Sequence, residues 1–341
     1  MFKKFLRNLL FSGKNRLKSG EKERLMAITE DRITKLAVEV TNICNANCIF
    51  CGYRHQKRKK YILSNEQFRY FLDKYVEYGG GELKFTPIVG DPLVDKNLID
   101  KIKMARRERC IGHMYLFTNL IGLNNFNITD FLLSGINRVY VSTCIGNKKM
   151  YKRVFGVDCY DVVISNIEKL LKENNKLGKP VKIVITSRGE RPYRGIYGSS
   201  DYKRIVGLYG ANIEILEEYG NWTGDVTENE LPRGHSFRKI KNRIEPCSQL
   251  YNGFIILANG DAGICWCTDL EANLIIGNVY KESLDDIWRG EKLKSMRENW
   301  LKGDMPPICR NCHIYTPVSV FLSCNRKKIN NTKESFQYAG K

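Results

Sequence analysis

Short apolar runs of strand length alternate with helical patterns over residues 35–220. A period of two predicts a half-buried strand, whereas apolar residues three and four positions apart predict a helix. The expected strands cover 36–41, 82–88, 113–118, 138–143, 181–187 and 212–216. Helical patterns cover 97–107, 128–133 and 160–174, and Ser64 with Gln67 predicts a capped helix start before Phe68. Six βα units predict an α/β barrel, incomplete because a closed eight-unit barrel typically needs about 250 residues.

The pattern changes after about residue 220. Apolar runs at 254–258 and 262–266 flank Asn259-Gly260 and predict a hairpin with a type I′ turn, and helical patterns follow at 284–289 and 291–301. We therefore expect a barrel over 35–220 and a small α+β module over 221–324. A basic N-terminal extension, 1–34, and a disordered basic tail, 325–341, complete the expected organisation.

The charge of the chain is concentrated in three segments. The 341 residues include 56 Lys and Arg against 37 Asp and Glu, a formal charge of +19. Residues 1–20, 54–60 and 325–341 carry +6, +5 and +4 of it, so the remainder is close to neutral and does not resemble a uniformly basic nucleic-acid binder. No apolar run reaches the roughly 18 residues of a transmembrane helix, and Arg7 interrupts the short apolar start, so we expect a cytoplasmic protein.

Three of the 12 cysteines follow the first expected strand with the spacing C-x3-C-x2-C: Cys44, Cys48 and Cys51. In a reducing compartment, clustered cysteines indicate metal or redox chemistry rather than disulfides. Three thiolates on one loop can bind three irons of a [4Fe–4S] cluster and leave the fourth iron open to a small molecule. A zinc site would be expected to show a fourth ligand at matched spacing, which this loop lacks.

A second group lies in the C-terminal module and comprises Cys247, Cys265, Cys309 and Cys312. A C-x2-C pair with two distant cysteines is compatible with an iron–sulfur cluster and with a structural zinc ribbon, and both remain open at this point. The other five cysteines have no partner spacing: Cys110, Cys144 and Cys159 are expected in the core, whereas Cys267 and Cys324 have no assigned role.

The first cysteine loop resembles the radical S-adenosylmethionine (SAM) superfamily, whose motif is C-x3-C-x-aromatic-C, with Phe50 at the aromatic position. The resemblance implies a partial (β/α)6 TIM-like barrel and a [4Fe–4S] cluster whose open iron chelates SAM. It also implies an electron donor such as flavodoxin or ferredoxin, and reductive cleavage of SAM to a 5′-deoxyadenosyl radical that abstracts hydrogen from a substrate.

Other family positions are carried over as expected SAM contacts. The family often has Gly-Gly-Glu-Pro after the second strand; here Gly90 and Pro92 agree, whereas Val89 and Asp91 depart from it. Thr118-Asn119 matches a common Thr-Asn at the third strand. The residues expected to bind the cofactor are therefore Phe50, Gly90, Asp91, Pro92, Thr118, Ser142, Ser187 and Arg188.

The C-terminal module is similar to the SPASM/twitch extension of many radical SAM enzymes. This resemblance implies one auxiliary [4Fe–4S] cluster on the four cysteines of the second group. Because all four irons would have thiolate ligands, electron relay rather than substrate binding is its expected role.

The expected function is a radical SAM oxidoreductase that dehydrogenates a small carbohydrate-like molecule. Alternatives are a maturase of a peptide or protein, and a non-catalytic zinc or iron–sulfur structural protein. The basic segment 54–60 is expected near the barrel mouth, where it would attract an acidic substrate. Trp222 is a candidate for the substrate pocket, and no catalytic acid or base is assigned.

Overall fold

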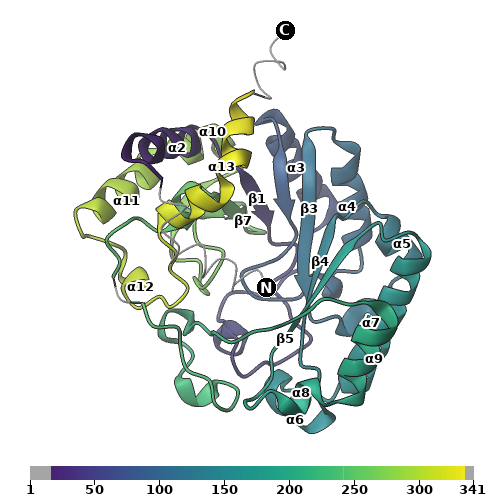
Figure 1. Ribbon diagram of the computed structural model, residues 1–341. Coiled ribbons are helices and arrows are strands. Elements are labelled where there is room, and N and C mark those ends of the chain that lie inside the picture. The colour runs from purple at the N-terminus through teal and green to yellow at the C-terminus, as the bar shows by residue number, and fades with distance from the viewer. Residues whose placement is uncertain (1–16, 241, 335–341) are drawn as a thin grey trace.

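The computed structural model describes residues 17–240 and 242–334. Its strands are β1 (Lys35–Val38), β2 (Gly81–Lys84), β3 (Ile111–Thr118), β4 (Arg138–Thr143), β5 (Lys182–Ser187), β6 (Ile213–Ile215), β7 (Gly253–Ile256), β8 (Asp261–Gly263) and β9 (Ile275–Asn278). They form one sheet in the order β6-β5-β4-β3-β2-β1-β7-β8-β9 (Figure 1). Strands β1 to β7 are parallel to one another. Strand β8 pairs antiparallel with β7 on one side and with β9 on the other. The linear order makes the sheet open, as expected for an incomplete barrel.

The helices are α2 (Ser19–Asp31), α3 (Asn65–Glu77), α4 (Leu98–Arg107), α5 (Ile128–Leu133), α6 (Lys148–Phe155), α7 (Tyr160–Lys176), α8 (Arg194–Tyr197), α9 (Ser200–Tyr209), α10 (Leu284–Arg289), α11 (Glu291–Leu301), α12 (Pro307–Arg310) and α13 (Val318–Glu334). Three short 3₁₀ turns border the sites described below: η2 (Gly52–His55), η3 (Pro92–Val94) and η5 (Trp222–Gly224). Helices α3, α4, α5, α7 and α9 cover one side of the parallel strands (Figure 1). The capping box predicted before α3 is confirmed, because Ser64 Oγ accepts from Gln67 N at 3.1 Å.

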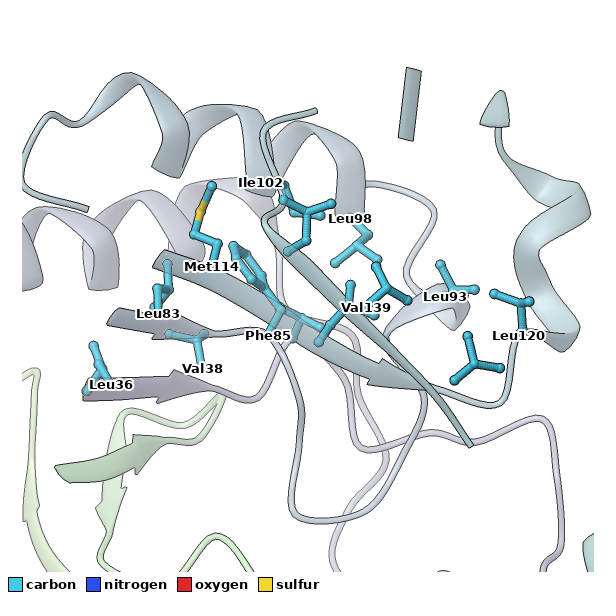
Figure 2. Packing of buried hydrophobic residues seen from close by; sticks show 14 of the residues in the cluster. Leu36, Val38, Leu83, Phe85, Leu93, Leu98, Ile102, Met114, Leu120 and Val139 are labelled. Atoms are coloured by element: carbon cyan, nitrogen blue, oxygen red, sulfur yellow. The ribbon is translucent and has the colours of Figure 1, made fainter. Parts of the chain in front are cut away.

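Alternation along the strands separates two faces of the sheet. Leu83, Met114 and Val139 are fully buried, and Figure 2 shows Leu83 and Met114 on the same side of the strands as Ile102 of α4. Because successive side chains of a strand point to opposite faces, the neighbours of these residues face the inner, concave side of the sheet. On β2 and β3 this side is therefore polar and aromatic rather than aliphatic. The apolar core of the barrel lies on the helical face.

The C-terminal module joins the barrel sheet directly. Strand β7 pairs in parallel with β1 over Lys35 to Val38, on the edge opposite β2. At Gly253, φ is +142°, and an added Cβ would lie 1.8 Å from the carbonyl oxygen of Lys35, so only glycine allows this approach. The expected boundary between a barrel and a separate module is thus crossed by a continuous sheet.

The predicted hairpin is present, but its turn differs from the type I′ prediction. Gly260 N donates to Leu257 O at 2.9 Å, and Gly260 alone of the two central candidates has a positive φ, of 81°. A type I′ turn needs positive φ at both central residues, and Asn259 does not have it. The turn therefore covers residues 257–260, and Gly260 is its last residue instead of its second central residue.

The disordered tail predicted for 325–341 is wrong for residues 325–334, which belong to α13. Val318, Leu322 and Ile329 are fully buried and recur at helical spacing, so one apolar stripe packs on the protein despite the polar residues around it. In the N-terminal extension, α2 packs against α13, and Trp288 Nε1 donates to Thr29 O at 3.0 Å. The rest of the expected extension, 1–16, and of the tail, 335–341, lies outside the described residues.

Candidate active site

The loop after β1 presents three half-buried cysteines, Cys44, Cys48 and Cys51. The end of α6 holds this loop at two points: Asn47 N donates to Phe155 O and Ile49 N donates to Val154 O, both at 3.0 Å. Burial raises the pKa of all three thiols. Free thiols would stay protonated there, and the positive charge of bound iron would stabilise the thiolate form. The three thiols therefore lie together on one loop, where bound iron would supply the charge that keeps them ionised.

Gly90 and Asp91 brace this loop from the side. Asp91 N donates to Ile43 O at 2.9 Å, and at Gly90, with φ of +125°, an added Cβ would lie 2.9 Å from Thr41 O. The Asp91 carboxylate accepts from Leu93 N at 3.0 Å, and burial raises its pKa to about 6. These contacts support the loop backbone. The Asp91 carboxylate therefore bonds within the protein, and it caps η3, which begins at the buried Pro92.

Thr118 and Asn119 at the end of β3 face opposite sides. Thr118 is buried, and its hydroxyl donates to Asp91 at 2.9 Å. Asn119 Nδ2 instead donates to Asn45 Oδ1 at 2.7 Å and lies 3.7 Å from Cys44 Sγ. Asn119, which the sequence prediction left out of the site, is thus the residue of this pair that contacts the cysteine loop. The alternation of side chains along β3 is the sequence feature that distinguishes Thr118 from Asn119.

Arg188 and Ser142 meet on the concave face, whereas Ser187 does not. Arg188 Nε donates to Ser142 Oγ at 2.9 Å, and the guanidinium lies 4.7 Å from the centre of the Phe50 ring. Ser187 is fully buried on the helical face, where its hydroxyl accepts from Ile145 N at 3.1 Å. A positioned guanidinium beside the aromatic residue of the cysteine motif suits a bidentate carboxylate.

Trp222 lies against the cysteine loop. Its Nε1 donates to Phe50 O at 2.9 Å, and a Cβ at Gly52 would lie 2.8 Å from the indole ring. Trp222 and Thr223 both have positive φ, 51° and 62°, an uncommon conformation for these residues. Trp222 therefore contacts the cysteine loop itself, and only the tertiary structure reveals this contact.

A second site lies in the C-terminal module. Its four cysteines, Cys247, Cys265, Cys309 and Cys312, line one pocket with about 460 Å³ of empty space, partly open to solvent. The other walls are mostly apolar, with Leu250, Trp300 and Tyr315 among them, and Thr223 of η5 also lines the pocket. Burial raises the pKa of Cys247 to about 12, so this group too needs a compensating cation to ionise.

The cysteines do not converge on one point. Among residues 17–240 and 242–334, no three Cys, His, Asp or Glu side chains gather closely enough to ligate one metal ion. Cys267 does not line this pocket; it packs beside Trp266 and Ile255.

The basic segment 54–60 is only in part a free cationic surface, because Lys57, Lys59 and Lys60 are exposed whereas its two arginines are paired. Arg58 forms a two-point ion pair with the fully buried Glu39, with both N–O distances 2.8 Å, and Arg58 Nε donates to Leu270 O at 2.9 Å. Arg54 and His55 lie 3.4 and 3.3 Å from Glu230. These contacts tie the segment to β1 and to the C-terminal module.

Family models match both parts of the chain. Residues 38–187 match the model described as radical SAM superfamily, and residues 247–313 match an iron–sulfur cluster-binding domain, SPASM. The two matches contain the two cysteine groups. No helix among the described residues has the length and apolar character needed to cross a bilayer.

Curated relatives match part of the chain. A "Probable GTP 3′,8-cyclase" of Pyrococcus abyssi is 28% identical over 188 residues, which are 54% of this chain and 56% of that protein. Another of the same name, from Sulfurisphaera tokodaii, is 29% identical over 140 residues, 41% and 44% of the two chains. The chain thus spans about half the length of these relatives.

Solved structures share the fold at low identity. BtrN in complex with AdoMet and 2-DOIA aligns with a TM-score of 0.53 and 17% identity, over 82% of this chain and 93% of that chain. SuiB of Streptococcus suis bound to the precursor peptide SuiA gives 0.57 and 16%, over 85% and 71%. Native anSMEcpe with bound AdoMet and a peptide gives 0.55 and 13%, over 88% and 99%.

Proposed function

Because the chain belongs to the radical SAM superfamily and carries a C-terminal SPASM domain, we propose that it dehydrogenates a small carbohydrate-like substrate. It is an enzyme whose cofactors are SAM and [4Fe–4S] clusters. The substrate, the residues that hold the cofactors and the electron relay are parts of the proposal.

Cys44, Cys48 and Cys51 would hold the cluster that binds SAM, because they share one loop that the end of α6 and Asp91 brace. With SAM bound, this centre supplies a 5′-deoxyadenosyl radical able to remove a hydrogen atom from an unactivated carbon. Arg188, whose Nε donates to Ser142, would bind the SAM carboxylate. The backbone at Gly90 approaches the loop closely enough to fix it, with Asp91 and Thr118 as its supports.

The observation that carries the oxidative proposal is the link between the two cysteine groups. Trp222 bonds to Phe50, which precedes Cys51, and the next residue, Thr223, lines the pocket of the second group. Cys247, Cys265, Cys309 and Cys312 would hold an auxiliary cluster that accepts the second electron of a dehydrogenation. A connection through one hydrogen bond and two adjacent residues supports electron relay between the sites.

A carbohydrate-like substrate is supported by the alignment with 93% of BtrN, a structure in complex with 2-DOIA. The second candidate is peptide modification. SuiB bound to a precursor peptide and anSMEcpe bound to a peptide share the fold equally well, and these complexes support the alternative.

The test is anaerobic reconstitution with iron and sulfide, followed by reduction in the presence of SAM. We expect about eight irons per chain, as two [4Fe–4S] clusters require, and formation of 5′-deoxyadenosine. Changing Cys44, Cys48 and Cys51 together to Ala should leave about four irons and abolish SAM cleavage. Changing Cys110, Cys144 and Cys159 together to Ala is the matched control and should keep all the iron. Zinc as the only metal bound would contradict the proposal.

The substrate class is tested by isotope transfer. Deuterium should pass from perdeuterated sugars or cyclitols into 5′-deoxyadenosine, and the product should lack two hydrogens. Transfer from deuterated peptides instead would select the second candidate.

A further inference from the structure

Lys84 places a buried cation on the concave face of the sheet. It ends β2, is 8% exposed, and follows Leu83, which points to the helical side. Its ammonium lies 5.9 Å from the Phe117 ring centre and 5.6 Å from that of Trp266. Trp266 comes from the C-terminal module, so the barrel and the module build this site together.

Among the described residues, Lys84 differs from two other lysines with little exposure, Lys101 and Lys35, in having no carboxylate partner. Lys101 pairs with Asp95 at 2.7 Å, and Lys35 pairs with Glu82 at 3.3 Å. For Lys84, the described residues provide no carboxylate within ion-pair distance, and its charge interacts instead with the thiols of Cys267 and Cys265. A buried ammonium without a carboxylate partner is costly, so an anionic group bound beside it would offset that cost.

An aromatic platform adjoins this cation. The rings of Phe117 and Tyr140 stack at 4.4 Å with an interplanar angle of 9°. Phe117 is 40% exposed although it lies on a central strand with β2 and β4 on either side. Because its neighbour Leu116 is buried on the helical face, the exposed ring faces the concave side. An exposed flat aromatic surface suits the apolar face of a sugar ring or another flat ring.

We infer that Lys84, Trp266 and the Phe117–Tyr140 pair form the substrate site and select a ring-bearing molecule with a phosphate or carboxylate group. This inference rests on the proposed function, because it takes the substrate to be carbohydrate-like. The anion binds the ammonium of Lys84, and the ring packs on Phe117. The cation of the site is thus inside the barrel rather than in segment 54–60.

The experiment measures binding of glucose 6-phosphate, glucuronate and glucose to the reconstituted, SAM-loaded enzyme by isothermal titration calorimetry. Both anionic sugars, or the one whose charged group the site prefers, should bind more tightly than glucose. K84M should weaken anionic-sugar binding by about tenfold to a hundredfold and leave glucose unchanged, as loss of a charged hydrogen bond predicts. K84R should restore part of the difference. F117L should weaken all three sugars.

K59M removes an exposed lysine of the same charge and should change none of these affinities. Iron content and SAM cleavage, measured on the same samples, report the proposed function independently and should be unchanged in K59M. Equal binding of anionic and neutral sugars, or K84M binding like wild type, overturns the inference even if SAM cleavage is intact. Absence of any sugar binding also overturns it, whereas loss of SAM cleavage in the wild type would refute the proposed function.

Discussion

Arg58→Met should destabilise the protein far more than loss of any exposed lysine beside it. The substitution removes both 2.8 Å contacts to Glu39, whose side chain is fully buried, and the bond to Leu270 O. Among the described residues, the Glu39 carboxylate would then retain only the hydroxyl of Tyr61 as a partner. Breaking a buried ion pair from one side typically costs about 3–5 kcal/mol, because the remaining charge is left uncompensated.

The assay is urea unfolding of the reconstituted protein, followed by circular dichroism under anaerobic conditions. Lys59→Met is the matched control, since Lys59 is exposed and carries the same charge; it should stay within about 0.5 kcal/mol of wild type. The double variant Glu39→Met, Arg58→Met removes both charges together and should recover most of the loss, to within about 2 kcal/mol of wild type. The reasoning is refuted if Arg58→Met shifts the free energy of unfolding no more than Lys59→Met does.

Three further predictions concern the sites. Trp222→Phe keeps an aromatic ring but leaves Phe50 O without its donor, so it should destabilise the protein by about 1–3 kcal/mol in urea unfolding and slow SAM cleavage. Cys265→Ser should lower bound iron from about eight to about four per chain, whereas Cys267→Ser should leave it unchanged; equal losses would contradict the ligand assignment. Arg188→Lys replaces a planar guanidinium, which can bind a carboxylate at two points, by a compact ammonium. The affinity for SAM should fall about tenfold or more in equilibrium binding, with iron content as the control.

The sequence predicted best what depends on local pattern. Residues 138–143 alternate regularly, and β4 covers the same positions. The Ser64 cap and the helices at 128–133, 284–289 and 291–301 are also confirmed, because capping and 3.6-residue periodicity are properties of adjacent residues. The mixed α/β fold with its parallel sheet followed from these elements.

The features that the sequence did not predict depend on contacts between segments far apart along the chain. Motif resemblance grouped Thr118 with the site, but the face of β3 places Asn119, not Thr118, against Cys44. The isolation of Lys84 from carboxylates depends on which strands flank β2 and on a hairpin far along the chain. Segment 54–60 was expected to attract an acidic substrate, because no local pattern predicts the ion pair between Arg58 and Glu39.

The pairing of β1 with β7 has a consequence for how the chain folds. Thr34 and Asn252, at the start of this pairing, are 218 positions apart and bond at 2.8 Å. During synthesis, one edge of β1 therefore stays unpaired until β7 has left the ribosome. A fragment that stops at residue 220 would keep this edge exposed for strand addition by another chain. We expect such a fragment to aggregate, so the two family domains are one unit for folding although they are two units by homology.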